Sequence, residues 1–586
     1  MFREGVVGCS PTHVILHASW AKRPRLPDRA YGGDSLATRS RGVALGLLQL
    51  GCDAAMPTLN WIGKEAVANH HQSVPFRLLK DVPDLACGEP GDGNLIVQGD
   101  NLLALKALLP YYAGQVKCIY IDPPYNTGNE GWVYNDNVNS PVIREWLGKV
   151  VGGEGETLDR HDRWLCMMYP RLALLRQFLR TDGAIFISID DHEYSRLKLV
   201  LDEIFGEANH AATFIWKRRT TPDSRNLNGV SGDHEYVVCY QRTPSFRLRG
   251  QAKDLTKYSN PDNDPRGPWM SDNLTGLANA AERPNLHYNL IHPETGARFP
   301  PHPSRGWIYG PERMSELIAD NRILWPRRAT GRPRLKRYVT DMLSDTTGFS
   351  TVLDAPGNVE ATKELSALLG PKTFAFPKPS RFVSLLIDQA AGPNDLILDS
   401  FAGSGTTAHA VLSLNSQDGG SRRFILVEME PRVAREVTVP RVRGVSEGLL
   451  DASGERVGGI GGAFRFCELG DPLFGESGAI RSDVSFGELA RHVYFTETGE
   501  PLPRERVPSS PFLGEYRGLG IYLLYNGILD DRSASGGNVL TRAVLSRLPR
   551  FKGPKVLYCA GCLLGTERLR AEGITVRQTP YEVRVS

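Results

Sequence analysis

Residues 119–126 read Ile-Tyr-Ile-Asp-Pro-Pro-Tyr-Asn, an apolar run that ends in an acid, two prolines and an aromatic ring. The run from 117 to 121 predicts a buried β-strand. Proline lacks a backbone donor and fixes φ, so the strand must end there. Asp122 and Tyr125 then lie at the carboxyl end of the strand, where open α/β sheets bind ligands. A carboxylate, a stiff turn with carbonyls and a stacking ring suit a planar base with an exocyclic amino group.

A second stretch, residues 399–407, reads Asp-Ser-Phe-Ala-Gly-Ser-Gly-Thr-Thr and links a predicted strand, 395–399, to a predicted helix, 406–414. With Ala408 it fits the pattern G-x-G-x-x-A, and Glu428 follows at the end of the next predicted strand. Taken alone, this pattern fits a dinucleotide-binding turn as well as any other adenosyl cofactor.

The two motifs together carry a family resemblance. Asp122-Pro123-Pro124-Tyr125 resembles the catalytic motif of the amino-methyltransferases that act on adenine N6 in DNA, and 399–407 resembles their S-adenosylmethionine loop. The catalytic motif comes first, which is similar to the β-type arrangement and in particular to the modification subunit of type III restriction–modification systems. The resemblance is strongest over 94–205 and 376–430. A dehydrogenase has no use for the first motif, so the pair favours a methyltransferase.

The resemblance implies which residues are catalytic and which bind the cofactor. The expected catalytic residues are Asp122, Pro123, Pro124 and Tyr125. The expected S-adenosylmethionine ligands are Asp399, Phe401, Gly403, Gly405, Thr406, Glu428, Asp100 and Lys378. Asp100 and Ser380 also sit where a helix begins, and both are predicted helix caps. Trp132, Trp164 and Trp216 are expected to pack in the core.

Strands alternate with helices over 94–207 and again over 376–440, which predicts a doubly wound, Rossmann-like α/β sheet built from two halves. Between the halves, 208–375 is dense in Pro, Gly, Asn and aromatic residues, and we expect it to be an inserted target-recognition domain. Residues 56–93 are expected to form a helical segment and linker, and 441–586 a smaller C-terminal α/β domain.

The formal net charge is only +3, so any contact with DNA must come from local basic patches. One such patch lies within the expected recognition domain, where 326–338 holds six basic residues and no acid: Arg327, Arg328, Arg332, Arg334, Lys336 and Arg337. On charge alone, a solvated loop explains this cluster equally well. Its place within a methyltransferase insertion favours phosphate contacts.

Composition places the chain among reduced globular proteins. Nine cysteines, an odd number spread widely, predict a cytoplasmic protein without disulfides. No apolar run is long enough for a membrane span. Cys559 and Cys562 form a lone CxxC without nearby ligands, so we expect packed cysteines and no metal site.

These observations predict a DNA methyltransferase that flips adenine out of the duplex and methylates N6 directly. Cytosine N4 is the alternative within the same chemistry, since the acid at 122 favours adenine where serine is commoner for cytosine. A DNA-specificity subunit without catalysis is the alternative from another class. The chain contains no P-loop motif and no evident nuclease motif, so restriction would need a separate helicase–nuclease chain.

Two further expectations concern association and the start of the chain. We expect a homodimer, with 440–586 as the docking surface for partners. Residues 1–55 show no sustained period and change composition at Met56, so we expect an extension outside the fold, with translation starting at Met56.

Overall fold

The computed structural model describes residues 58–88, 93–127, 160–222, 229–302, 304–328, 330–450, 456–475, 479–503, 510–525, 528–529 and 537–579. The expected N-terminal extension, residues 1–55, and Trp132 lie outside the described residues. Among the described residues, no helix is both long enough and apolar enough to cross a membrane.

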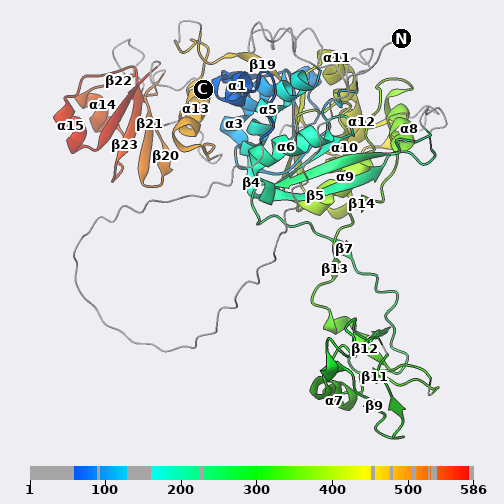
Figure 1. Ribbon diagram of the computed structural model, residues 1–586. Helices are drawn as coiled ribbons and strands as arrows, with labels where there is room; N and C mark the ends of the chain where they lie inside the picture. Colours follow the sequence, from blue (N-terminus) through cyan, green and yellow to red (C-terminus); the bar gives the residue numbers. More distant parts are fainter. Residues whose placement is uncertain are drawn as a thin grey trace, which may run out of the picture. The chain divides into compact units, whose positions relative to one another are not determined.

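The centre of the fold is a ten-stranded sheet in the order β1-β19-β2-β16-β15-β3-β4-β6-β5-β14 (Figure 1). The six neighbours from β19 to β4 are parallel, whereas β1 and β6 run in the opposite direction. The predicted α/β class is confirmed. The strands are β1 (Arg77–Asp81), β2 (Leu95–Gln98), β3 (Val116–Ile121), β4 (Leu179–Ile189), β5 (His210–Lys217), β6 (His234–Gln241), β14 (Val352–Leu353), β15 (Leu396–Asp399), β16 (Arg423–Glu428) and β19 (Arg465–Pro472).

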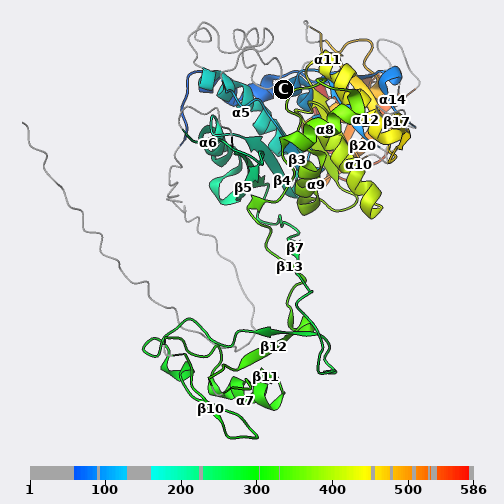
Figure 2. The same ribbon diagram turned by 90° about the vertical axis from the view of Figure 1, so that its right-hand side faces the viewer.

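Helices cover both faces of this sheet, because successive strand residues point to opposite faces. Ile119 and Ile121 of β3 pack in one core with α3, α5, α6 and α13, whereas Cys118 and Tyr120 pack in the other with α9, α10 and α12. Figure 2 shows α5 and α6 on one side of the sheet and α9, α10 and α12 on the other. The helices are α1 (Lys64–Ala68), α2 (His70–Ser73), α3 (Asn101–Tyr112), α5 (Arg160–Phe178), α6 (Tyr194–Phe205), α8 (Asn358–Leu369), α9 (Ser380–Ala390), α10 (Thr406–Asp418), α11 (Pro431–Val433), α12 (Val439–Glu447) and α13 (Phe486–Thr498).

The point where the winding reverses lies between β15 and β3, which are hydrogen-bonded neighbours. From β15 the chain passes through α10 to β16, its neighbour on one side. From β3 the chain passes through α5 to β4, which lies in the opposite direction along the sheet. A crevice at the carboxyl ends of the strands is expected where connections diverge in this way. Both sequence motifs, 122–125 and 399–407, follow these two strands.

The segment between β6 and β14 has a small core of its own. Leu274, Trp307, Met314 and Leu335 are buried in one cluster that is separate from the two faces of the large sheet. Its elements are β7 (Gln251–Ala252), β8 (Trp269–Asp272), β9 (Leu290–Ile291), β10 (Arg298–Phe299), α7 (Pro311–Ala319), β11 (Ile323–Leu324), β12 (Arg334–Tyr338) and β13 (Thr346–Thr347).

The C-terminal part forms a second, four-stranded sheet in the order β20-β21-β23-β25. The helix Thr566–Ala571 connects the last two of these strands in the chain. Cys559 and Cys562 lie in neighbouring short strands, and no cluster of three metal ligands occurs among the described residues. The elements are β17 (Gly448–Leu450), β18 (Arg456–Gly458), β20 (Phe512–Tyr516), β21 (Leu519–Leu523), β22 (Val539–Leu540), α14 (Arg542–Arg547), β23 (Lys555–Cys559), β24 (Gly561–Cys562), α15 (Thr566–Ala571) and β25 (Ile574–Gln578).

Three of the predicted domain boundaries differ from the structure. β5, β6 and β14 belong to the large sheet, so the segment that leaves the sheet is shorter than the predicted 208–375. β1 and β19 also join that sheet, although 56–93 and 441–586 were expected to lie outside it. The reason is that β5 and β6, like β1 and β19, are antiparallel partners. Antiparallel neighbours need no crossover helix, so strand–helix alternation does not mark them.

Candidate active site

Asp122 lies at the end of β3 in a cluster of charged and aromatic side chains. The ammonium of Lys378 donates to both Asp122 oxygens, Oδ1 at 2.7 Å and Oδ2 at 2.8 Å, and to the Tyr125 hydroxyl at 2.8 Å. The Tyr125 hydroxyl lies 2.9 Å from Asp122 Oδ1 and 3.0 Å from Glu235 Oε2. The same ammonium is 3.4 Å from Glu235 and 4.9 Å from the centre of the Tyr125 ring.

Burial sets the electrostatics of this cluster. Burial raises the pKa of Asp122, with Lys378 acting against the shift. For Lys378, burial disfavours the charged form, but Asp122 and Glu235 outweigh it and raise the pKa. Lys378 and Glu235 expose only 8% and 7% of their side chains. The cluster thus holds a charged lysine between two carboxylates, shielded from water.

The turn after Asp122 is fixed by its surroundings. The indole N–H of Trp164, on α5, donates to the Pro124 carbonyl at 2.7 Å. Asn126 has a left-handed φ of 59° and donates to the Arg160 carbonyl at 3.0 Å. Within the described residues, no hydrogen bond engages the Pro123 carbonyl. The Pro123 carbonyl is therefore available as a hydrogen-bond acceptor beside Asp122. Trp164 is buried in the core, as predicted.

The glycine loop follows β15 and is braced by Asp399. This buried acid accepts hydrogen bonds from the Phe401 amide at 2.9 Å and from the Thr407 hydroxyl at 2.5 Å. Burial raises its pKa to about 7. Gly405 has a φ of 78°, and a β-carbon there would lie 3.2 Å from methyl groups of Thr438 and Val442. The loop therefore requires glycine both for backbone conformation and for close packing.

Glu428 lies at the end of β16, next to this loop. Its two oxygens accept hydrogen bonds at 2.8 Å from the backbone N–H groups of Gly403 and Glu430. Gly403 has a left-handed φ of 53°. Burial raises the pKa of Glu428 to about 8. A buried acid thus borders the glycine turn at the neighbouring strand end, as expected of a ligand for ribose hydroxyls.

Arg441, on α12, binds the glycine loop through two of its hydroxyl side chains. Its guanidinium is fully buried and donates to the hydroxyls of Ser404 and Thr406, each at 2.8 Å. It also pairs with Glu364 of α8. Burial opposes ionisation of Glu364, but His409 and Arg441 lower its pKa to about 2. The loop is thereby tied to α8, the helix that leads back from the small inserted core.

Glu364 also explains why one predicted cap is wrong. Pro379 is the N-cap residue of α9 and makes no side-chain cap, whereas the Ser380 hydroxyl donates to Glu364 at 2.7 Å. Ser380 is instead the first residue of the helix, and its amide and its hydroxyl both donate to Glu364. Asp100 behaves as predicted: it caps α3 through the amides of Leu102 and Leu103.

One pocket joins the two motifs. Tyr120 and Asp122 from the end of β3 line it together with Asp399 and the loop after β15. The remaining lining residues are Phe374, Phe376, Pro377, Lys378, Phe401, Ala402, Gly403, Ser404, Thr406 and Thr407. Asp100 does not line this pocket, and its second oxygen pairs with Arg171 at 2.9 Å. Lys378 lines the pocket, but its ammonium points to Asp122 and Tyr125.

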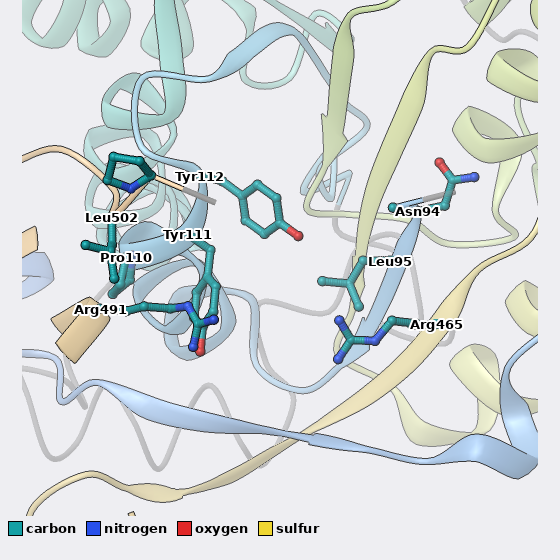
Figure 3. Close-up of a pocket in the computed structure, with 10 residues that line it drawn as sticks. Asn94, Leu95, Pro110, Tyr111, Tyr112, Arg465, Arg491 and Leu502 are labelled. Carbon is teal, nitrogen blue, oxygen red and sulfur yellow. The ribbon is translucent and has the colours of Figure 1, made fainter. Parts of the chain in front are cut away.

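A second pocket is lined by residues at the amino ends of two strands of the sheet (Figure 3). It borders the first residues of β2 and β19, which are Leu95 and Arg465, and it is lined by Tyr111, Tyr112 and Arg491. The carboxyl ends of parallel strands, not their amino ends, are the usual ligand sites in such sheets. None of the residues predicted for catalysis or cofactor binding lines it.

The predicted basic cluster divides into three groups. Lys336 is buried and pairs with Asp262 at 2.5 Å, so it holds the inserted core together and cannot reach a phosphate. Arg337 pairs with Asp272 at 2.6 Å, and Arg334 donates to Ser271 at 2.6 Å, although both are exposed. In the described part of the chain, no bond or ion pair occupies the three other exposed side chains, Arg327, Arg328 and Arg332.

Two residues of the site escaped sequence reasoning, Glu235 and Arg441. Glu235 belongs to β6, which runs against its neighbours, so that the amino end of β6 meets the carboxyl ends of β3 and β4. A lone acid at the start of a short apolar strand was the only sequence signal. Arg441 lies on α12, which follows Glu428 in the chain. The sequence indicated it only as a basic residue within an apolar stretch of a helix.

The DNA methylase family model, N6_N4_Mtase, matches residues 116–438, which is more than half of the chain and includes both strand ends. The chain belongs to this family. The match begins at β3 and continues past the glycine loop to the helical turn that leads into α12. All residues that line the pocket of this DNA methylase therefore lie within the family match.

Curated relatives of this methylase fall into two groups. The chain is 36% identical to the StyLTI Mod subunit, a type III restriction-modification enzyme of Salmonella typhimurium, over 58% of this chain and 52% of that protein. It is 32% identical to the type III EcoP15I Mod subunit of Escherichia coli, over 64% of each. It is 31% identical to the type II methyltransferase M.KpnI of Klebsiella pneumoniae, over 60% of this chain and 88% of that protein. The match thus spans half to two thirds of the Mod subunits.

Proposed function

We propose that this DNA methylase transfers a methyl group from S-adenosylmethionine to the N6 amino group of adenine in duplex DNA. The observation that carries the proposal is the shared pocket: Asp122 and the glycine loop line one cavity, at the point where the winding of the sheet reverses. Family membership supports DNA as the substrate. The whole site is built from neighbouring strand ends, where α/β sheets bind their ligands.

The loop fits S-adenosylmethionine. Gly403, at positive φ, lines the pocket and leaves the backbone open to close approach. Gly405 lets the loop pack against Thr438 and Val442, and the carboxylates of Asp399 and Glu428 lie beside the loop. Gly403, Gly405, Phe401 and Thr406 would hold the cofactor, with Glu428 near the ribose. When bound, the cofactor supplies an electrophilic methyl group on a sulfonium. Asp100 caps α3 and pairs with Arg171, and a contact between Asp100 and the cofactor stays a prediction.

The residues of the 122–125 turn would present the amine. A base must leave the duplex before its amino group can reach a buried carboxylate. Tyr125 would stack on the extruded base, while Asp122 and the Pro123 carbonyl accept the two amino hydrogens. Those bonds draw the nitrogen lone pair out of conjugation with the ring and orient it. Trp164 holds the Pro124 carbonyl, so the turn is rigid before the base arrives, as positioning requires.

Cytosine N4 is the second candidate, since it offers the same amino geometry to the same turn. An acid at 122 favours adenine. A specificity subunit without catalysis is disfavoured, because Asp122 and Gly403 line one pocket and Gly405 is present in the loop that borders it.

The similarity to Mod subunits supports a place in a type III restriction–modification system. In that setting the protein would act in the cytoplasm on double-stranded DNA, as a homodimer, with a separate helicase–nuclease subunit. The segment between β6 and β14 would read the target sequence. The exposed arginines at 327, 328 and 332 would contact phosphates, whereas Lys336 would not.

The test has two arms. Long-read sequencing of DNA from cells with and without the protein identifies the methylated base and its sequence context. Purified protein then methylates a duplex with that site, and calorimetry measures S-adenosylmethionine affinity. Asp122→Ala should lose transfer and keep cofactor affinity, while the exposed acid Asp84 serves as control, with Asp84→Ala unchanged in both. Transfer by Asp122→Ala at the wild-type rate would refute the mechanism, and N4-methylcytosine in the DNA would refute the choice of base.

A further inference from the structure

Asp122 is partly blocked by its own counter-ion. Lys378 donates to both oxygens of Asp122, at 2.7 and 2.8 Å, and therefore competes for the lone pairs that a target amino group needs. A carboxylate accepts strongly only where its charge is not already shared. Something must draw the ammonium away when the amine arrives.

Glu235 is the group placed to do so. Its Oε2 lies 3.4 Å from the Lys378 ammonium, so a shift of less than an ångström would complete a hydrogen bond. Glu235 exposes 7% of its side chain and lies on β6, between β4 and β5. The lysine is confined as well, because its ammonium lies 4.9 Å from the Tyr125 ring and 5.9 Å from the Trp216 ring.

The Tyr125 hydroxyl links the two carboxylates. It has one proton but lies 2.9 Å from Asp122 and 3.0 Å from Glu235, so it can donate to only one of them at a time. When it donates to Glu235, a lone pair on Asp122 Oδ1 is released. Both donors to Asp122, the hydroxyl and the ammonium, thus have Glu235 as their alternative acceptor.

We infer that Glu235 is a positioning residue for methyl transfer: it takes over Lys378 and the Tyr125 hydroxyl when the target amino group binds, and Asp122 then meets the amine as a free carboxylate. The inference rests on the proposed function.

Other charged groups also face Glu235 and limit how it is tested. The Arg218 Nε lies 3.5 Å from Glu235 Oε1. The negative charge of Glu235 also contributes to raising the pKa of Asp190, which follows β4 and is raised mainly by burial. Both remain in every variant, so neither accounts for a difference among them. Glu235→Gln preserves shape and keeps an acceptor for Tyr125, but it removes the charge that attracts Lys378.

The experiment compares wild type, Glu235→Gln, Lys378→Met and the double variant on a duplex with the site found by sequencing. Glu235→Gln should lower the single-turnover rate roughly 10- to 100-fold, because Lys378 stays on Asp122, with cofactor affinity within about twofold of wild type. The double variant should be faster than Glu235→Gln alone, since no ammonium is left to block Asp122. A purely structural role predicts the reverse, with losses that add.

A second readout needs no cofactor. With 2-aminopurine in place of the target adenine, Glu235→Gln should show less fluorescence from the extruded base than wild type. Glu235→Asp keeps the charge and should fall between the two, which covers a failure of Glu235→Gln to fold. The exposed Glu207, just before β5, is the matched control, and Glu207→Gln should equal wild type.

Three results would overturn the inference. They are a wild-type rate for Glu235→Gln, a double variant slower than both single variants, and equal 2-aminopurine fluorescence in wild type and Glu235→Gln. A wild-type protein that methylates no DNA would instead refute the proposed function itself.

Discussion

Replacing Arg441 by alanine tests whether the glycine loop depends on support from behind. The side chain is fully buried, donates at 2.8 Å to the hydroxyls of Ser404 and Thr406, and pairs with Glu364. Arg441→Ala removes all three interactions at once. The loop would then keep its glycines but lose the donor that holds its two hydroxyl residues in place.

The loss in free energy of unfolding can be estimated from the groups that lose their partner when Arg441 is removed. Removing one partner of a buried ion pair costs about 3–5 kcal/mol, because the other charge remains without compensation. Glu364 is 20% exposed and still accepts from Ser380, so the lower end applies, about 3 kcal/mol. The Ser404 and Thr406 hydroxyls lose a donor, which adds about 1 kcal/mol. We expect a total of about 4 kcal/mol.

Urea unfolding followed by tryptophan fluorescence measures the free energy of unfolding. Calorimetry measures the affinity for S-adenosylmethionine, which depends on the conformation of the glycine loop. Cofactor affinity should fall by about tenfold, a difference of about 1.4 kcal/mol. Arg441→Lys should lie between, since a lysine keeps the charge but not the fork of donors. Arg432, which is 75% exposed and 4.0 Å from Glu436, is the control, and Arg432→Ala should change stability by less than about 0.5 kcal/mol. Equal stability and affinity for Arg441→Ala and wild type would refute the reasoning.

Three further predictions address the loop, the strand-end acid and DNA. Gly405→Ala places a β-carbon at 3.2 Å from two methyl groups and at positive φ, so calorimetry should show cofactor affinity lost by about tenfold or more. The pKa of Asp399 is raised to about 7 by burial, so the folded protein holds a proton that the unfolded chain has lost. Stability should therefore fall as pH rises from about 4 to about 7, and Asp399→Asn should flatten this slope in urea titrations. The slope of log affinity against log salt should decrease by about 0.9 for each phosphate contact removed in single alanine variants of Arg327, Arg328 and Arg332.

Sequence reasoning succeeded where the signal was local. The strand before Asp122 and the helix after Gly405 are defined by apolar periods and by proline or glycine at their ends, and both are present. Buried, nearly continuous apolar runs also marked the parallel strands β15 and β16. The two strands whose ends form the pocket were therefore predictable, and six of the predicted site residues line it: Asp122, Lys378, Asp399, Phe401, Gly403 and Thr406.

It failed where a partner strand or a buried charge decided the outcome. β5 and β6 follow one another without a helix, so their composition resembled that of the insertion. Lys336 looked like a phosphate ligand, because nothing in the sequence shows that Asp262 lies beside it. Ser380 looked like a cap until the structure placed Glu364 next to its hydroxyl. Each error concerns a contact that no local sequence pattern indicates.

The reversed strand β6 connects these errors to function. A parallel strand at this position would bring its carboxyl end to the pocket, and Tyr240 would then stand where Glu235 does. Because β6 is antiparallel, the residue that faces Asp122 comes from the start of a strand, beyond the reach of strand-end motifs. The charge balance around Asp122 therefore depends on a hairpin whose direction the sequence motifs do not record. Variation at Glu235 is where we expect to find differences in how firmly a methylase of this family holds its target amine.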